Sequence, residues 1–333
     1  MIEMLPVRGL PEVVQGDDLG TLIAEATELR DGDVVVVAQK IVSKAEGAVV
    51  RLPPGTDVAA TRRRLAGEQS LRTVVDAPWA LVVQTRHGLV CANAGIDASN
   101  TPEGTLVLLP DDPDASARRL RSRLRERTGA DVAVVVSDTF GRPWRTGQTD
   151  VAIGVAGLPP IRDERGGVDR QGRRLEVTEV AVADEVSAAA DLVRRKADGV
   201  PVVVVRGLAF EIDDAASSSA LIRDAALDLF PRGRGMLGPA LVEAADRGPA
   251  WSQPVTRSDL DRAVAAVDTW SGLPRGLRLA HLEGPAPTTI RVLGAGLRRR
   301  GVVAGVLTAV LVDLGYRARV RTTWRHVQVE AGR

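Results

Sequence analysis

Polar residues able to do chemistry follow one strongly apolar segment of the chain. The apolar run is Val132–Val136, and Asp138 and Thr139 come almost directly after it, with Arg142 and Arg145 close behind. Carboxylate and hydroxyl oxygens suit hard divalent cations such as Mg²⁺ or Mn²⁺. Guanidinium groups suit the oxygens of phosphate or carboxylate. Carboxylates for a metal beside cations for an anion indicate phosphoryl transfer.

Other polar segments follow other strand-like runs. Lys40 and Lys44 come after the apolar residues Val34–Val37, and Asp97 comes after the run Ala80–Gln84. In open α/β sheets ligands bind outside the carboxyl ends of the strands, so we expect these side chains to converge. Taken singly, each has a simpler role as a helix cap, a turn residue or a solvated charge. Together they favour a metal and phosphate site, although the chain has no G-x-x-x-x-G-K-[ST] loop and no G-x-G-x-x-G after a strand.

Strand-like and helix-like segments alternate along the first two-thirds of the chain. Buried strands are predicted at Asp33–Ala38, Ala80–Gln84, Thr105–Leu109, Val132–Val136 and Val200–Val205. Helices are predicted at Asp112–Gly129, Val180–Lys196 and Ala215–Phe230. Residues Gly166–Arg173 predict a turn or the tip of a hairpin. This alternation predicts an α/β fold of mixed α+β layers.

A change of composition near Arg247–Pro254 divides the chain. We predict a first domain of residues 1–247 and a small appended α+β unit of residues 248–333, whose role is unknown. In this unit, helices are expected from Ser258 and over Val302–Leu314, and β structure over Leu277–Leu282, Thr288–Leu293 and Arg317–Val329. A unit of roughly 80 residues can form a core of its own, though only a marginal one.

Composition limits the classes of protein to consider. The chain of 333 residues is 44% hydrophobic, which is enough for a sizeable core. Its 44 Lys and Arg against 43 Asp and Glu leave a net charge of +1, which does not indicate the basic field of a nucleic-acid-binding protein. The single cysteine, Cys91, excludes an intrachain disulfide framework and a cysteine-rich zinc site. Without a recognisable signal peptide or a bilayer-length apolar run, we expect a cytoplasmic protein that binds no membrane.

Five motifs, in order along the chain, carry a resemblance to a known family. They are QKIVSKAEG, TRHGLVCANAGIDASN, LLPDDPDASA, VSDTFGRPWRTGQTDVAIGVAG and VTEVAVADEVSAAADLV. From about Leu5 to about Phe230 the chain resembles the coenzyme F420-0:L-glutamate ligase family, the γ-glutamyl ligases. The resemblance implies that family's own mixed α/β fold and an intertwined homodimer. It also implies GTP-dependent addition of L-glutamate to F420-0, and then of further γ-linked glutamates, with Mg²⁺ or Mn²⁺ and with K⁺ as a further candidate ion.

The resemblance also assigns roles to residues. Nucleotide contacts would fall on Gly9, Leu10, Pro11, Glu12, Gln39, Lys40, Lys44 and Asn100. A first metal ion would be held by Asp97 and Asp138, and a second would use the hydroxyl of Thr139. Arg142 and Arg145, like Asp138, become candidate catalytic residues, because the substrate carries a phosphodiester and a terminal carboxylate.

The chain departs from the family pattern in two places. The resemblance implies a further nucleotide and metal segment at Arg194–Asp198, and within it Arg195 and Lys196 stand where relatives usually carry Gly and often Gln. Because a cation cannot ligate a metal, these two side chains would contact phosphate instead. The C-terminal unit is also about half the size of the flavin-binding nitroreductase-like domain that is fused to the ligase in some relatives, a domain of ordinary size.

Several functions remain open. The first is a GTP-dependent acid–amino-acid ligase that works through an acyl phosphate, with His87 as a candidate base. The others are a bifunctional ligase with FMN-dependent reductase activity, a ligase acting on another acid, and a nucleotide-binding regulator derived from the ligase. Retention of Asp97, Asp138, Thr139 and Lys44 favours a ligase over a regulator.

Overall fold

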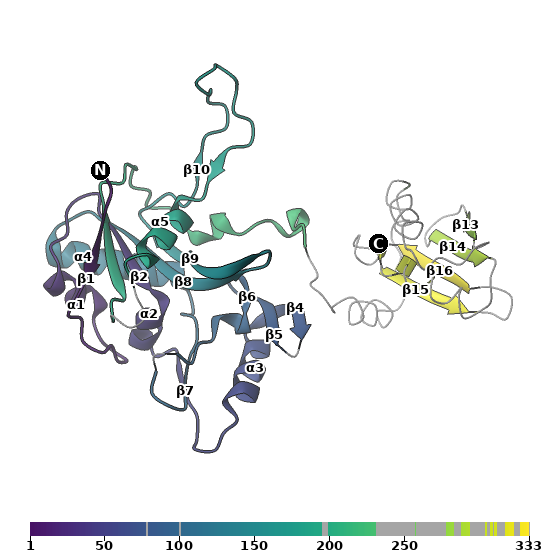
Figure 1. The fold of residues 1–333 in the computed structure, drawn as a ribbon, viewed down its shortest axis with the longest axis horizontal. Coiled ribbons are helices and arrows are strands. Elements are labelled where there is room, and N and C mark those ends of the chain that lie inside the picture. The colour runs from purple at the N-terminus through teal and green to yellow at the C-terminus, as the bar shows by residue number, and fades with distance from the viewer. Residues whose placement is uncertain are drawn as a thin grey trace. The chain divides into compact units, whose positions relative to one another are not determined.

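The chain divides into two compact units, each described here by itself (Figure 1). The computed structural model describes residues 1–77, 79–99, 101–194, 199–230, 257, 278–282, 288–293, 304, 307–308, 310–311, 317–322 and 327–332. The first unit comprises Met1–Thr73 and Pro78–Asp228, and the second comprises Val74–Ala77 and Leu229–Arg333. The predicted domain boundary between residues 247 and 248 lies outside the described residues and stays a prediction.

The first unit is built on a five-stranded sheet. Its strands, in spatial order, are β1 (Glu3–Val7), β12 (Val202–Arg206), β2 (Val34–Ala38), β8 (Ala133–Arg142) and β9 (Arg145–Ala156). Within this sheet β2 and β8 run parallel and the other neighbours run antiparallel. The central strands are runs of valine because both faces of the sheet are covered. The predicted α/β fold of mixed layers is confirmed.

Helices cover the two faces of this sheet. One face packs on α1 (Leu19–Ala26), α2 (Gln39–Glu46) and α4 (Pro113–Thr128), and the other packs on α5 (Val182–Asp191). Successive valines of one strand alternate between the two cores, so that Val134 belongs to the first and Val135 to the second. The alternation fixes which side of the sheet each later residue of β8 faces.

The helix α4 forms where the sequence predicts it. The Asp112 side chain accepts a hydrogen bond from the Ala115 backbone N–H, and Pro113 occupies the first turn. Gly129 ends the helix in the left-handed conformation, with a φ of 76°, and its N–H donates to the Arg125 carbonyl. These local signals suffice to predict the ends of α4 because the capping residues need no partner from elsewhere in the chain.

A smaller layer completes the first unit. It contains α3 (Val58–Glu68), the strands β5 (Ala80–Thr85) and β6 (Val90–Ala92), the 3₁₀ turn η1 (Asn93–Gly95), and the paired strands β3 (Val49–Arg51) and β7 (Thr105–Val107). The strand β4 (Ser70–Ala77) pairs with β5, and only its first residues, up to Thr73, are assigned to this unit. A separate apolar core that includes Leu65, Val83 and Leu106 holds this layer together. The chain from β6 to β7 brings Asp97 to the main sheet side of the layer, where it pairs with a residue of α2.

Three sequence predictions need correction. The apolar run that ends at Val136 is only the first half of β8, which continues to Arg142 and turns back into β9. The helix expected at Val180–Lys196 is shorter, since α5 ends at Asp191. The helix expected at Ala215–Phe230 is absent there, and the segment holds only two 3₁₀ turns, η2 (Ser218–Leu221) and η3 (Ala225–Leu227).

Hydrogen bonds of two serines explain why Ala215–Phe230 does not form the predicted helix. Ser217 donates its hydroxyl to Asp114, and Ser218 donates its backbone N–H to the same carboxylate and its hydroxyl to the Ile153 carbonyl. Side-chain hydrogen bonds of this kind compete with the helical pattern. These hydrogen bonds therefore hold the segment against α4 and β9 in an irregular conformation.

The predicted turn at Gly166–Arg173 is confirmed as the tip of a long hairpin. The hairpin starts from β10 (Arg162–Asp163) and returns through β11 (Glu179–Val180), and Val168 pairs with Arg174 near the tip. It projects from the rest of the first unit (Figure 1).

The second unit contains a four-stranded antiparallel sheet. Its strands are β13 (Arg278–Leu282), β14 (Thr288–Leu293), β15 (Arg317–Thr322) and β16 (Val327–Gly332), in the order β13-β14-β16-β15. Both predicted strands at Leu277–Leu282 and Thr288–Leu293 are confirmed, and the predicted β segment after Arg317 is a pair of strands. The described residues between Ala304 and Leu311 are helical, as predicted, whereas the helix expected from Ser258 lies outside the described residues. Among the helices described in either unit, none is long and apolar enough to cross a membrane.

Candidate functional site

The candidate site lies at the end of β2, where the neighbouring strand β8 continues without a partner on that side. β2 ends at Ala38, which pairs with Ser137, whereas β8 continues to Arg142 with β9 as its neighbour. The chain turns away after Ala38 because α2 begins at once with Gln39. The freed edge of β8 borders a cavity of about 610 Å³. Its polar lining consists of Glu12, Gln39, Lys40, Lys44, Asp97, Ser99, Ser137, Asp138, Thr139, Gln148, Asp150, Asp191 and Arg194.

The cavity receives side chains from both faces of β8. Thr139 lies opposite Asp150 on β9 and donates its hydroxyl to that carboxylate at 2.8 Å, so the two share a face. Asp138 lies opposite Val151, which packs on the core under α2. Because β8 has no partner on the β2 side here, neighbouring residues that point to opposite faces both line the same cavity.

Asp97 and Lys40 form an ion pair on the α2 side of the cavity. The Lys40 ammonium lies 2.7 Å from Asp97 Oδ2 and also donates to the carbonyl and hydroxyl oxygens of Ser99. Burial alone would raise the pKa of Asp97, but the hydrogen bonds from Lys40 and Ser99 hold it below its usual value. Asp97 is therefore ionised at neutral pH.

Asp138 has the opposite electrostatic environment. Burial, together with repulsion from Asp150 and Asp97, raises the pKa of Asp138 to about 7 against the favourable effects of the Thr139 backbone N–H and Lys40. A carboxylate held near other carboxylates in this way gains stability from any cation that enters the cavity.

Asp150 and Arg194 form a buried ion pair on the α5 side. The Arg194 Nη2 lies 2.8 Å from Asp150 Oδ2, and the two side chains are 7% and 5% exposed. The same nitrogen donates to the Ser137 hydroxyl at 2.7 Å, and Ser137 donates to Asp150. Arg194 Nε is buried without an acceptor among the described residues. Burial lowers the pKa of Arg194 despite the attraction of Asp150 and Asp191.

The segment Leu10–Val13 and α2 form the third wall. Lys44 Nζ lies 2.5 Å from Glu12 Oε1, and the Lys44 side chain is largely buried whereas Glu12 is exposed. The side-chain amide of Gln39 donates to Ser43 and to the Leu108 carbonyl, so it is committed to holding α2 in place. The Lys44–Glu12 pair thus places a largely buried cation at this wall against an exposed carboxylate.

The structure brings most of the predicted site residues to this one cavity. They are Leu10, Pro11, Glu12, Gln39, Lys40, Lys44, Asp97, Asp138 and Thr139. Gly9 precedes the lining segment and is exposed. Asn100, Arg195 and Lys196 lie outside the described residues.

Three other predicted residues lie elsewhere. Arg142 and Arg145 are exposed at the tip of the β8–β9 hairpin, where Arg142 donates to the carbonyls of Thr146 and Gly147, and neither lines the cavity. His87 bonds the Asp111 carbonyl and is also absent from the lining, and its role as a base stays a prediction. The roles assigned to the two arginines stay predictions.

Sequence reasoning did not find the pairing of Asp150 with Arg194. Gly147, with a φ of 90°, permits the turn that carries the chain back along β8 and places Asp150 opposite Thr139. The resemblance implies a nucleotide and metal segment that includes Arg194, but the contact of Arg194 with Asp150 depends on where α5 ends.

A divalent cation fits one part of the cavity by the chemistry of its donors. Among the described residues no three His, Cys, Asp or Glu side chains form a metal-binding group by themselves. Mg²⁺ is commonly bound by one or two carboxylates together with water and substrate phosphates. Asp97 and Asp138 supply such a pair, and burial followed by repulsion from neighbouring carboxylates raises the pKa of Asp138.

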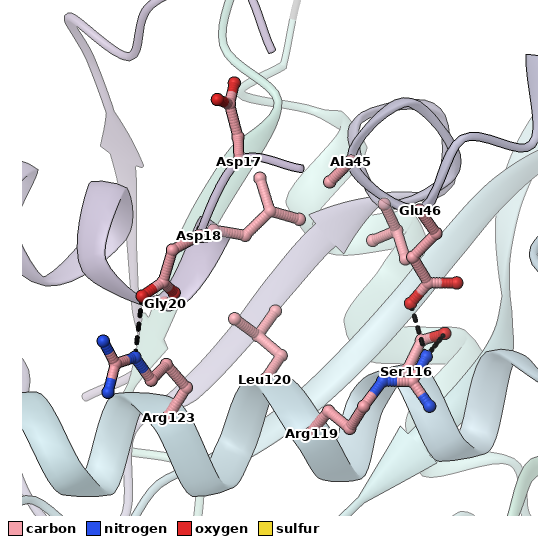
Figure 2. Close-up of a pocket in the computed structure, with 11 residues that line it drawn as sticks. Asp17, Asp18, Gly20, Ala45, Glu46, Ser116, Arg119, Leu120 and Arg123 are labelled. Atoms are coloured by element: carbon pink, nitrogen blue, oxygen red, sulfur yellow. Dashed lines mark hydrogen bonds and ion pairs between the residues drawn. The ribbon is translucent and has the colours of Figure 1, made fainter. Parts of the chain in front are cut away.

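A smaller cavity of about 280 Å³ lies between α1, α2 and α4. Figure 2 shows that two arginines of α4 flank Leu120 there, with Arg119 bonded to Glu46 and Arg123 bonded to Asp18. These two ion pairs connect α4 to the end of α2 and to the start of α1 at the surface. Such pairs contribute modestly to stability and do not indicate a ligand.

The fold and the larger cavity define an α/β layered domain with a site at one end of its sheet that is lined by charged side chains. Residues 9–207 match the family model described as F420-0:Gamma-glutamyl ligase. The "Coenzyme F420:L-glutamate ligase" of Methanothermobacter thermautotrophicus is 44% identical over 249 residues, which cover 69% of this chain and 98% of that protein. The proteins of the same name from Methanopyrus kandleri and Archaeoglobus fulgidus are 42% and 44% identical, covering 69% and 62% of this chain and 96% and 88% of theirs. The chain belongs to the F420-0:gamma-glutamyl ligase family.

Proposed function

We propose that this protein joins L-glutamate to coenzyme F420-0 in a GTP-dependent ligation, in the biosynthesis of coenzyme F420. One observation carries the proposal. The residues that the resemblance assigns to nucleotide and metal by name come from separate segments of the chain, and apart from Gly9 and Asn100 those named for direct contacts line one cavity. Family membership over residues 9–207 supports the same reaction class.

The reaction runs in two steps. The terminal carboxylate of F420-0 attacks the γ-phosphorus of GTP, and GDP leaves, which gives an acyl phosphate. The amine of L-glutamate then attacks the acyl carbon, a new amide bond forms, and phosphate leaves with the release of a proton. Proximity of the two acids and the nucleotide in one cavity supplies much of the rate enhancement.

The residues of the chain act on charge and position. Lys40 and Lys44 bind phosphate oxygens, and each exchanges its carboxylate partner, Asp97 or Glu12, for the phosphate. Asp97 and Asp138 hold the divalent cation, Mg²⁺ or Mn²⁺. When bound, that cation neutralises negative charge on the transferring phosphoryl group. The role of Arg142 and Arg145 in holding the anionic substrate, and a homodimeric assembly, belong to the same proposal.

The test is mass spectrometry of F420-0 incubated with the purified protein, L-glutamate, GTP and either Mg²⁺ or Mn²⁺. The expected product is heavier than F420-0 by one glutamyl residue, and GDP and phosphate accumulate in step with it. Replacement of GTP by ATP is the control for the nucleotide. Folded protein that forms no glutamylated product with either metal would overturn the proposal. The visible absorbance of the same preparation tests the reductase alternative, because a bound flavin is yellow.

A further inference from the structure

Arg194 is an arginine buried inside the cavity that the proposed reaction uses. It follows α5, and its guanidinium reaches Asp150 and Ser137 on the central sheet. The three side chains are almost fully withdrawn from water. Removing a guanidinium and a carboxylate from water is costly, so the geometry of their contact indicates what the pair is for.

The contact uses only part of the arginine. A guanidinium carries five N–H donors in a planar fork, and a carboxylate can accept two of them side by side. Here a single nitrogen, Nη2, serves both Asp150 and Ser137, while Nε has no acceptor among the described residues. A pair that served stability alone would leave no buried donor unsatisfied.

The oxygens around Arg194 resemble a cation site. Asp150 accepts from both the Thr139 and the Ser137 hydroxyls, so one carboxylate and two hydroxyls gather at this wall. These are hard oxygen donors of the kind that bind Mg²⁺ and Mn²⁺. The positive charge of Arg194 occupies the place where such an ion would compensate Asp150.

We propose that Arg194 is a built-in cation of the cavity, which excludes a second divalent ion from Asp150 and Thr139 and turns its remaining donors toward an anionic group of the substrate. The cavity then takes one divalent ion, at Asp97 and Asp138. The inference rests on the proposed function for the identity of the anion, a phosphate or carboxylate, but not for the count of metal ions. It replaces the second metal that the family resemblance implied at Thr139.

The test is a titration of the full-length protein with Mn²⁺ alone, followed by electron paramagnetic resonance of the free ion. The wild-type protein is expected to bind one Mn²⁺ per chain. Arg194→Met removes the charge with an unbranched, shorter side chain, frees the oxygens of Asp150 and Ser137 from Arg194, and is expected to gain one further Mn²⁺. Arg194→Gln serves as a second uncharged variant with the same expected gain, and Arg194→Lys keeps the charge and the wild-type number.

Two controls separate this gain from other effects. Asp138→Asn is expected to lose the wild-type Mn²⁺, and in the double variant with Arg194→Met the added ion remains. Arg206→Met removes another arginine that pairs with a buried carboxylate, Asp33, and leaves the Mn²⁺ number unchanged. Equal Mn²⁺ numbers in the wild type and in a folded uncharged variant would overturn the proposal, as would two ions in the wild type. Since the titration contains no F420-0, glutamate or nucleotide, its result is independent of the ligation assay.

Discussion

Two buried carboxylates of the central sheet each pair with an arginine, at opposite ends of the sheet. Asp33, at the start of β2, meets Arg206 at the end of β12 through two parallel bonds, Nε to Oδ1 at 2.8 Å and Nη2 to Oδ2 at 2.7 Å. Asp150 meets Arg194 through a single nitrogen, and Arg194 Nε has no acceptor within the described part of the chain. In the first pair two neighbouring nitrogens of the guanidinium bind both carboxylate oxygens. In the second pair only one nitrogen binds the carboxylate, so other N–H donors of Arg194 are not used by Asp150.

The two arginines also differ in electrostatics. The hydrogen bond that Arg206 donates to Asp33 is the main reason that the pKa of Arg206 is raised, whereas burial lowers the pKa of Arg194. An arginine whose charged form is favoured by its partner stabilises the fold at that point. An arginine whose charge is only partly compensated gains from a further anion. The comparison indicates that the Asp33 end of the sheet serves structure and the Asp150 end serves binding.

The largest loss of turnover is expected for Asp138→Asn. This substitution removes the carboxylate that lies between the α2 side and the α5 side of the cavity, at the end of the sheet that we assign to binding. Neutralising a metal ligand is expected to lower kcat by more than about 10²-fold, because even residues that only orient a metal ligand cost 10–100-fold. The measurement is steady-state ligation at saturating GTP over a Mn²⁺ titration. Near wild-type turnover at any metal concentration would show that Asp138 holds no ion.

The same variant has a predicted effect on stability. The pKa of Asp138 is raised from 3.8 to about 7, so the folded state holds this proton more tightly than the unfolded state does. The metal-free wild type therefore loses stability from this group as pH rises from about 4 to about 7, and Asp138→Asn removes that loss. Urea unfolding of both proteins at pH 5 and pH 8 checks the sign. A larger pH-dependent loss in the variant than in the wild type would contradict it.

A smaller loss of turnover is expected for Arg194→Met. A charge-assisted hydrogen bond contributes about 1.5–3 kcal/mol, which corresponds to roughly 10–100-fold in rate. Arg194→Lys is expected to recover part of the loss, since it returns the charge without the planar fork. The check is kcat/KM for GTP and for F420-0 in both variants. If Arg194→Met and the wild type share the same constants, Arg194 touches no substrate, and the two ion pairs are both structural.

A weaker effect is expected for Lys44→Ala. Lys44 contacts an exposed carboxylate of Glu12, so a phosphate displaces that partner easily and the lysine contributes to binding in ground state and transition state alike. KM for GTP is expected to rise about tenfold with kcat little changed, the pattern of lost uniform binding. Lys44→Arg is the control that keeps the charge. A fall in kcat at unchanged KM would assign Lys44 to the transition state instead.

The sequence predicts those parts of the fold that depend on local signals. The valine runs of β2, β8 and β12 and the caps of α4 are found where expected, because burial on two faces and capping leave marks within a few residues. The segment Ala215–Phe230 is predicted wrongly as a helix, since its hydrogen bonds go to Asp114, about 100 residues earlier in the chain. Local propensity cannot register a partner at that distance.

The candidate site divides in the same way. Asp138 and Thr139 stand out because polar residues follow an apolar run, and the motifs assign Asp97, Lys40 and Lys44 by resemblance. The pairing of Asp150 with Arg194 joins residues 44 positions apart and needs both the β8–β9 hairpin and the end of α5. Residues whose roles arise from such a meeting carry no signature of their own in a single sequence.

The smallest effect on turnover, and the sharpest test of the comparison, is expected for Arg206→Met. Asp33 is 1% exposed, so removing its partner leaves a buried carboxylate without a cation and is expected to cost about 3–5 kcal/mol in the free energy of unfolding. Turnover of the folded variant is expected to stay within about twofold of the wild type, because the cavity lies at the other end of β2 and β12 and distant sites act additively. Urea unfolding and the ligation assay on the same preparation measure the two quantities. Arg206→Met combined with Asp33→Asn is the control, and it is expected to recover stability by removing the orphaned charge. A loss of turnover as large as that of Arg194→Met in folded protein would break the comparison, since it would mean that both arginines act on the cavity through the sheet.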